Sequence, residues 1–127
     1  MAKVTGIGGV FFKADDPAAL QAWYVENLGM VPDAEGYMVI RWGEGGIEES
    51  GSTVWAPFPS DTEYMGSPEK RWMVNYRVDD LDGLLAQLRG RGVTVSEETA
   101  EDENGRFGWC WDPEGNKVEL WEPNPGM

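Results

Sequence analysis

Two stretches of the chain decide its fold: residues 4–17, VTGIGGVFFKADDP, and residues 71–81, RWMVNYRVDDL. Each begins with β-branched and aromatic residues, which are typical of a strand. Each then reaches an aspartate pair, and aspartate is a favourable helix N-cap. The second aspartates of the two pairs, Asp16 and Asp80, stand 64 residues apart in a chain of 127 residues. The sequence therefore predicts an internal repeat that divides the chain into two halves.

Both halves continue in the same way. Apolar residues recur at helical spacing after Asp16 and after Asp80, and Gly29 and Gly92 are expected to end the two helices. Strands are then predicted at residues 37–42 and 52–58 in the first half, and at 93–97, 106–111 and 117–121 in the second. We therefore expect an α+β fold in which each half has the element order β-α-β-β-β.

The chain is long enough for one ordinary domain. We expect a single domain over residues 1–127, with a first module at 1–62 and a second at 68–127. Residues 57–70 contain three prolines and several polar residues, so they are expected to connect the halves. Residues 43–51 are polar and rich in glycine, which predicts a loop.

The composition excludes several kinds of chemistry and partner. The chain has no histidine, which rules out histidine bases, Ser-His or Cys-His nucleophile pairs and imidazole metal ligands. Its formal net charge of −13 disfavours nucleic acid and would suit a cationic ligand, although an acidic surface often serves solubility alone. No apolar run approaches the roughly 20 residues of a membrane span. With no visible secretory signal and a single cysteine, Cys110, we expect a cytoplasmic protein.

One face of the predicted sheet combines large aromatic side chains with a few polar ones. Side chains alternate along a strand, so Glu119 faces away from the helices if Val118 and Leu120 face toward them. Cys110 then lies on the helix side as a small core residue. The same argument gives the candidate ligand-binding residues of the opposite face: Phe11, Thr53, Trp55, Met73, Asn75, Arg77, Trp109, Trp111 and Trp121.

Two interpretations of this face stay open. Aromatic walls with a few polar groups describe a pocket for a small molecule. Tryptophan and methionine are also enriched where subunits meet. A pocket beside a subunit interface would satisfy both interpretations.

Short motifs along the chain resemble those of the vicinal oxygen chelate (VOC) superfamily. That superfamily includes glyoxalase I, extradiol dioxygenases, fosfomycin-resistance enzymes and bleomycin-resistance proteins. The motifs are GVFFKADD at 9–16, WY at 23–24, LGM at 28–30, NYRVDDL at 75–81, GRF at 105–107, DPEGN at 112–116 and VELW at 118–121. The resemblance covers nearly the whole chain. It implies two βαβββ modules whose curved mixed sheet forms a cup, commonly within a homodimer.

The resemblance also implies where a metal ion would bind. In metal-dependent members, four inward side chains on four strands hold a divalent ion, and these positions fall at Gly9, Met73, Glu119 and either Thr53 or Trp55. Glycine offers no side-chain ligand, and a methionine thioether suits Cu(I) better than a hard divalent ion. Only Glu119 matches the family, so we expect no divalent metal and no other cofactor.

Glu119 is the candidate catalytic residue. In an aromatic cup it would act as a general base or anchor a cationic ligand, and loss of solvation would raise its pKa. Alternatively it would form a salt bridge across the sheet with Arg77, Lys13 or Arg41, because buried carboxylates are usually paired. A paired glutamate can still bind a ligand.

These observations favour one function over two alternatives. We expect a metal-free, tryptophan-lined cup that binds a small aromatic or cationic molecule, as bleomycin-resistance proteins do. The first alternative is a glyoxalase-like lyase or isomerase that uses Glu119 as a base or as a residual metal ligand. The second is an enzyme-derived structural or regulatory scaffold, which predicts a filled cup with no pocket.

Overall fold

The two stretches that carry the repeat form the centre of one mixed sheet. The structure is a computed structural model, and it describes residues 1–34, 36–42 and 51–127. Within these ranges seven strands pair in the order β2-β3-β1-β4-β7-β6-β5. The elements are β1 (Val4–Ala14), α1 (Pro17–Leu28), β2 (Met38–Arg41), β3 (Ser52–Pro59), β4 (Trp72–Val78), α2 (Leu81–Gly90), β5 (Ala100–Asp102), β6 (Gly105–Trp111) and β7 (Lys117–Pro123).

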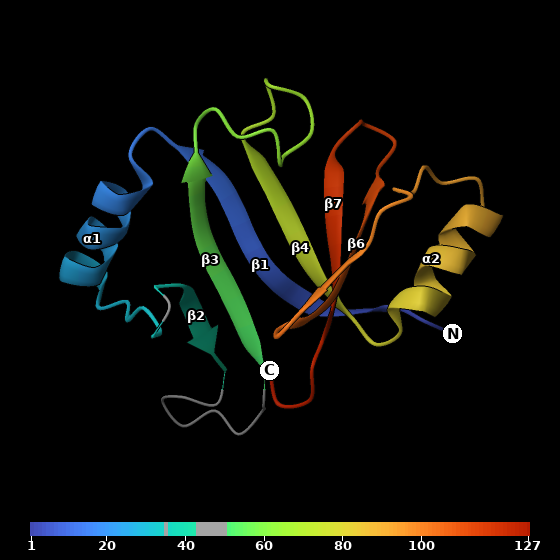
Figure 1. Ribbon diagram of the computed structural model, residues 1–127, viewed down its shortest axis with the longest axis horizontal. Coiled ribbons are helices and arrows are strands. Elements are labelled where there is room, and N and C mark those ends of the chain that lie inside the picture. Colours follow the sequence, from blue (N-terminus) through green and yellow to red (C-terminus); the bar gives the residue numbers. More distant parts are fainter. Residues whose placement is uncertain (35, 43–50) are drawn as a thin grey trace.

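The pairing of β1 with β4 has the geometry expected between two related halves. The strands run antiparallel, and Val10 lies opposite Val74, its equivalent 64 residues later. On the outer side of each strand, a parallel partner follows from the same half: β3 beside β1 and β7 beside β4. The sheet curls, and α1 and α2 lie at its two flanks (Figure 1). This is the α+β fold with a curved mixed sheet that the resemblance predicts, and the prediction is confirmed.

Both helices begin where the aspartate pairs predict. The Asp16 carboxylate accepts the backbone N–H of Ala19 at 3.1 Å, and the Asp80 carboxylate accepts that of Gly83 at 3.0 Å. Each cap satisfies one of the backbone donors that an N-terminus leaves unpaired. Gly29 ends α1 with a φ of 70°, a left-handed conformation that glycine adopts without strain.

The two helices differ in how firmly they pack. Helix α2 buries Leu81, Leu84 and Leu85 in a core cluster with residues of β4, β6 and β7. Helix α1 has no buried residue, and Trp23 is 52% exposed. Cys110 lies in the α2 cluster, which is the helix side that the alternation predicts.

The predicted strand at residues 93–97 is wrong. Its backbone is shared between two other elements: Val93 N–H bonds the Leu88 carbonyl of α2, and Ser96 N–H bonds the Trp109 carbonyl of β6. Only an isolated bridge, between Val95 and Cys110, forms there. The strand that follows α2 is β5 instead, an exposed edge strand in the acidic tract.

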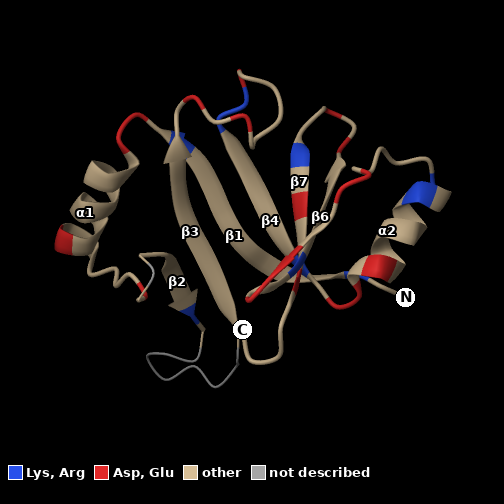
Figure 2. Cartoon of the chain, in the orientation of Figure 1, with Lys and Arg blue, Asp and Glu red and all other residues tan. Residues whose placement is uncertain are grey.

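The first half also differs from the predicted order. In the described part of the chain, two strands rather than three follow α1. The predicted loop at residues 43–51 lies outside the described residues, apart from Gly51. Among those described, no helix is both long enough and apolar enough to span a membrane. Charged residues gather mainly in the turns, at strand ends and on the helices, and β1, β3 and β4 are uncharged along most of their length (Figure 2).

Candidate functional site

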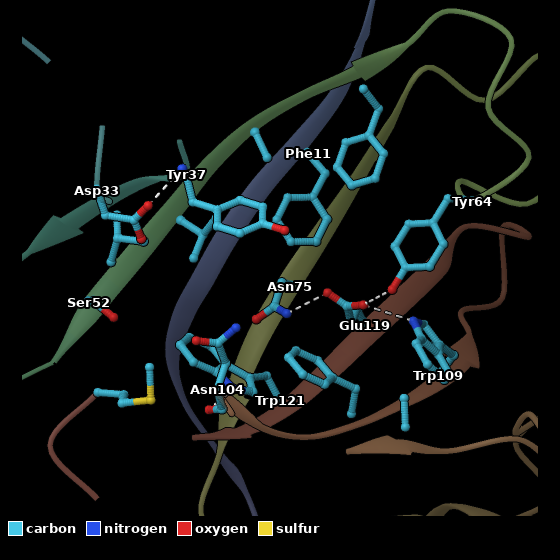
Figure 3. Close-up of a pocket in the computed structure, with 17 residues that line it drawn as sticks. Phe11, Asp33, Tyr37, Ser52, Tyr64, Asn75, Asn104, Trp109, Glu119 and Trp121 are labelled. Atoms are coloured by element: carbon cyan, nitrogen blue, oxygen red, sulfur yellow. Dashed lines mark hydrogen bonds between the residues drawn. The ribbon is translucent and has the colours of Figure 1, made fainter. Parts of the chain in front are cut away.

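A cavity of about 420 Å³ opens on the face of the sheet opposite the helices. Apolar and aromatic side chains form most of its wall, with a smaller number of polar groups (Figure 3). This size and composition are typical of a small-molecule pocket. The cup is therefore hollow, which contradicts the filled cup that the scaffold interpretation predicts.

Strand register brings one row of residues across the floor of this cavity. Gly9 of β1 pairs with Val54 of β3 on one side and with Asn75 of β4 on the other. Asn75 pairs in turn with Glu119 of β7, which pairs with Trp109 of β6. Because paired residues share a face of the pleated sheet, four side chains from four strands meet beside a glycine.

Glu119 is the centre of the polar contacts. It is 2% exposed, and three neutral donors surround its carboxylate (Figure 3). The Tyr64 hydroxyl and the Trp109 indole N–H both donate to Oε1, the latter at 3.1 Å. The Asn75 amide donates to Oε2 at 2.6 Å. These bonds offset part of the cost of burying the carboxylate.

Burial dominates the protonation of this group. It raises the pKa of Glu119 above its ordinary value of 4.5, although the hydrogen bonds from Tyr64, Asn75 and Trp109 oppose the shift. The pKa of Tyr64 is raised as well, first by burial and then by the negative charge of Glu119. Tyr64 therefore stays protonated and remains a hydrogen-bond donor to the carboxylate.

The predicted salt bridge of Glu119 is wrong. Among the described residues the ion pairs involve Arg106 instead. The Lys13 ammonium donates to the Pro68 carbonyl at 2.8 Å, so it is satisfied at the end of β1. Arg41 is an exposed residue at the end of β2. Sequence alternation gave the face of these side chains but not their distance along the strands.

Arg77 has a different environment from the one predicted. Its guanidinium lies between the indole rings of Trp42 and Trp121, 5.0 and 5.1 Å from their centroids. It also donates to the backbone carbonyls of Ser52 and Met127, at 3.1 and 2.7 Å. Cation–π contact and hydrogen bonding thus hold Arg77 behind Trp121, and Arg77 itself does not line the cavity.

Of the predicted site residues, five line the cavity. These are Phe11, Asn75, Trp109, Glu119 and Trp121. Met73 lies on the same face but is completely buried, in a cluster with Phe11 and Trp109. Trp111, opposite Lys117 at the end of β6, lies outside the lining.

Thr53 and Trp55 face away from the cavity, so their prediction is wrong. Trp55 packs against the rings of Phe12 and Tyr24, on the α1 side of the sheet. The Thr53 hydroxyl accepts the Trp42 indole N–H and donates to the Ile7 carbonyl. Strand β3 is apolar on both faces, so its alternation could not show which side was inward. Neither residue occupies the remaining ligand position, since Val54 is the residue opposite Gly9.

Sequence reasoning missed most of the wall. The lining residues that it did not name are Asp33, Tyr37, Val39, Ser52, Val54, Ala56, Phe58, Tyr64, Ala100, Asn104, Phe107 and Met127. Many of them come from loops, the edge strands or the β3 face that was assigned in reverse. Their one visible signal is the pair of aromatic residues, Phe58 and Tyr64, in an otherwise polar connection.

Tyr64 is the most consequential of these omissions. The connection that carries it is anchored by Met65, which is 1% exposed. The Lys117 ammonium donates to the Tyr64 carbonyl at 3.1 Å and lies 4.9 Å from the centroid of its ring. A segment without periodicity is therefore fixed firmly enough to direct a hydroxyl at Glu119.

The residues present do not fit the four-ligand metal site of the superfamily. No group of three or more Asp, Glu, Cys or His side chains occurs among the described residues. A Cβ atom at Gly9 would lie 2.9 Å from both the Phe11 ring and the Val54 carbonyl oxygen, so a ligating side chain has no room there. Met73 is packed in the core, and Glu119 is surrounded by neutral donors.

Comparisons with solved structures support the fold. A methylmalonyl-CoA epimerase from Mycobacterium tuberculosis is 24% identical, with a TM-score of 0.63, over 96% of this chain and 90% of that one. A methylmalonyl-CoA epimerase in complex with methylmalonyl-CoA and NH4+ is 16% identical, with a TM-score of 0.71, over 98% and 99% of the two chains. A variant epimerase from Streptomyces coelicolor, in complex with 2-nitronate-propionyl-CoA, gives 17% and 0.70 over 95% and 99%.

The curved sheet and these neighbours define a member of the VOC superfamily, which confirms the resemblance. The chain belongs to the glyoxalase-like domain family, whose model matches residues 9–121. Among curated proteins, none matches the chain. Identities below 25% show a shared fold and not a shared reaction.

Proposed function

We propose that this protein binds a small planar aromatic molecule in its cup, without a divalent metal ion. The observation that carries this proposal is the cavity of about 420 Å³, whose wall is largely apolar and aromatic around one buried carboxylate. Trp109 and Trp121 provide rigid rings against which a flat ligand can pack. The neutral surroundings of Glu119 support a binding role that needs no metal.

Tryptophan fluorescence offers a direct test, with 2-naphthol as a neutral planar probe. We expect saturable quenching at one ligand per chain in the presence of a chelator. The variant Val54→Phe should weaken binding, because Val54 lines the cavity. Val10→Phe is the matched control, since Val10 is 43% exposed on the opposite face of β1. Equal affinities of the two variants would contradict binding in the cup.

A second candidate is a glyoxalase-like lyase or isomerase in which Glu119 is the base. The raised pKa of Glu119 and its hydrogen bond from Tyr64 favour this candidate, because a base with a pKa nearer neutrality transfers protons efficiently. Incubation with methylmalonyl-CoA in deuterated water separates the two candidates. Binding alone predicts no deuterium at the carbon next to the thioester beyond the uncatalysed level, whereas an isomerase would introduce it.

A further inference from the structure

The polar end of the cavity presents mainly hydrogen-bond acceptors. A hydroxyl and an indole each have one proton to donate, and both the Tyr64 and the Trp109 proton go to Glu119. One N–H of the Asn75 amide goes to the same carboxylate, and its second N–H is the remaining donor among these groups. Within the described chain, Glu119 Oε2 accepts one hydrogen bond, from Asn75, and keeps free lone pairs.

Asn75 contributes a second acceptor. Its side-chain oxygen, Oδ1, is buried and has no hydrogen-bond partner in the described chain. Buried polar atoms of native proteins almost always have a partner. Because Asn75 lines the cavity beside Glu119, an N–H group of a ligand can supply the partner that this oxygen lacks.

The charge of the wall points the same way. Its lining residues include the carboxylates of Asp33 and Glu119 and no lysine or arginine. The nearest ammonium, that of Lys117, is directed to the Tyr64 carbonyl and to the rings of Tyr64 and Trp109. An anionic ligand would meet like charge and few donors.

We propose, building on the proposed binding function, that the ligand is a planar nitrogen heterocycle or aryl amidine in its protonated form. Its N–H groups donate to Glu119 Oε2 and to Asn75 Oδ1. Its ring occupies the aromatic part of the cavity between Phe11 and Trp121. A charge-assisted hydrogen bond of this kind is about twice as strong as a neutral one, so the ligand's charge should decide affinity.

Three ring-matched probes test this inference: 2-aminoquinoline at a pH where it is protonated, neutral 2-naphthol, and anionic 2-naphthoate. We expect the cation to bind at least about tenfold more tightly than 2-naphthol, and the anion to bind most weakly. A cation no tighter than 2-naphthol, or an anion that binds best, would overturn the inference and leave the proposed function standing. Failure of all three probes to bind would instead contradict the proposed function itself.

A pair of variants separates Glu119 from the overall negative charge. Glu119→Gln should reduce the preference for 2-aminoquinoline over 2-naphthol. Glu114→Gln makes the same change of charge in an exposed turn, and the preference should remain. An undiminished preference in a folded Glu119→Gln protein, checked by circular dichroism, would overturn the inference. If that variant does not fold, the probe series on the unmodified protein decides alone.

Discussion

At the scale of single residues, two adjacent glycines shape the site. Asn75 occupies the space in front of Gly8, where a Cβ atom would lie 2.0 Å from its Oδ1 and 2.8 Å from Cε3 of Trp121. Gly9 is closed in a similar way by Phe11 and Val54. The glycines thus allow the side chains of neighbouring strands to cross the floor of the cavity.

Gly8→Ala should therefore displace Asn75 and lower the free energy of unfolding by about 1–3 kcal/mol. Gly90→Ala is the control, because nothing lies within 4 Å of a Cβ there and alanine favours the end of α2. Urea unfolding of both variants makes the measurement. Equal stabilities of the two would show that the space before Gly8 is not limiting.

Glu119 should also leave a signature in the pH dependence of stability. Because its pKa is raised in the folded state, the folded protein holds this proton more tightly than the unfolded chain does. Stability should therefore fall as pH rises from the ordinary carboxyl value of 4.5 through the raised pKa. Glu119→Gln should flatten the curve across this window, whereas Glu114→Gln should leave its slope intact. Parallel curves for unmodified protein and Glu119→Gln would argue against the shift.

The sequence predicts Glu119 correctly for a reason that does not extend to Tyr64 or Trp55. Strand β7 alternates clearly, with Leu120 in the core and Glu119 on the opposite face. Trp55 is as apolar as its inward neighbours, since α1 covers it from the other side. Tyr64 lies in a connection with no period, and only tertiary contacts direct it to the site.

At the scale of elements, the two helices have different roles although their caps are alike. Helix α2 is part of the core, and α1 rests on β1 and β3 without burying a residue completely. The repeat in sequence predicts both helices and their starts. It could not predict this difference, because helical spacing alone does not measure how much of a face becomes covered.

Leucine truncations should reveal that difference. Leu85→Ala removes a side chain that is 3% exposed in the α2 core and should cost about 2–5 kcal/mol. Leu28→Ala, at the end of α1 and 61% exposed, should cost less than about 0.5 kcal/mol. Chemical denaturation gives both values. A large cost at Leu28 would mean that α1 is covered in solution by something outside the chain.

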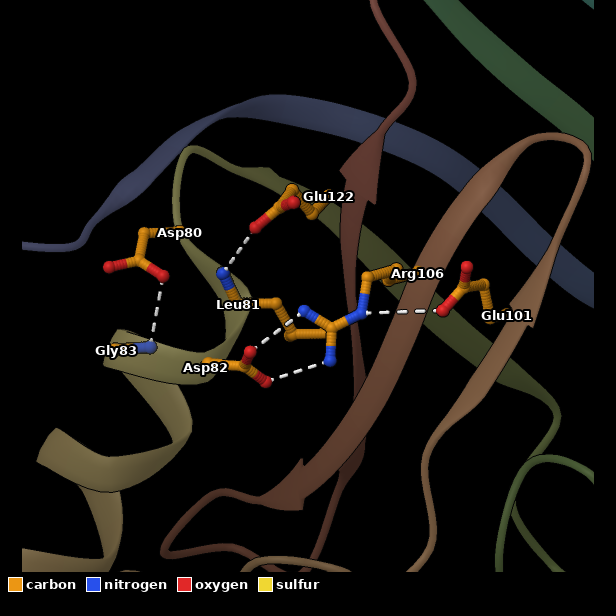
Figure 4. Close-up of polar contacts among 7 residues, drawn as sticks. All are labelled: Asp80, Leu81, Asp82, Gly83, Glu101, Arg106 and Glu122. Atoms are coloured by element: carbon orange, nitrogen blue, oxygen red, sulfur yellow. Dashed lines mark hydrogen bonds and ion pairs between the residues drawn. The ribbon is translucent and has the colours of Figure 1, made fainter.

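The edge strand β5 is joined to α2 through Arg106. Its guanidinium contacts both oxygens of Asp82, at 2.8 and 3.0 Å, and lies 3.8 Å from Glu101 of β5 (Figure 4). The Asp82 and Glu101 side chains are 73% and 75% exposed, so water screens the pairs. Arg106→Gln should therefore lower the free energy of unfolding by no more than about 1 kcal/mol, as followed by thermal or urea unfolding. A loss of several kcal/mol would show that β5 depends on this contact.

At the scale of the whole molecule, the repeat builds a cup and the differences between its halves give the cup its chemistry. The pairing of Val10 with Val74 relates the central strands. Yet Gly9 offers no side chain, Met73 is buried, and Glu119 keeps three neutral partners. The arrangement is better suited to holding a flat molecule than to holding a divalent ion.

One measurement tests this account most directly: an NMR titration of the tryptophan indole N–H signals with 2-aminoquinoline, in chelator-treated protein. The account predicts saturable shifts for Trp109 and Trp121, which line the cavity. The signals of Trp55, on the α1 side, and of Trp23, on the exposed face of α1, should stay in place. Shifts confined to Trp55 and Trp23, or shifts that appear only after a divalent metal is added, would contradict a metal-free binding cup.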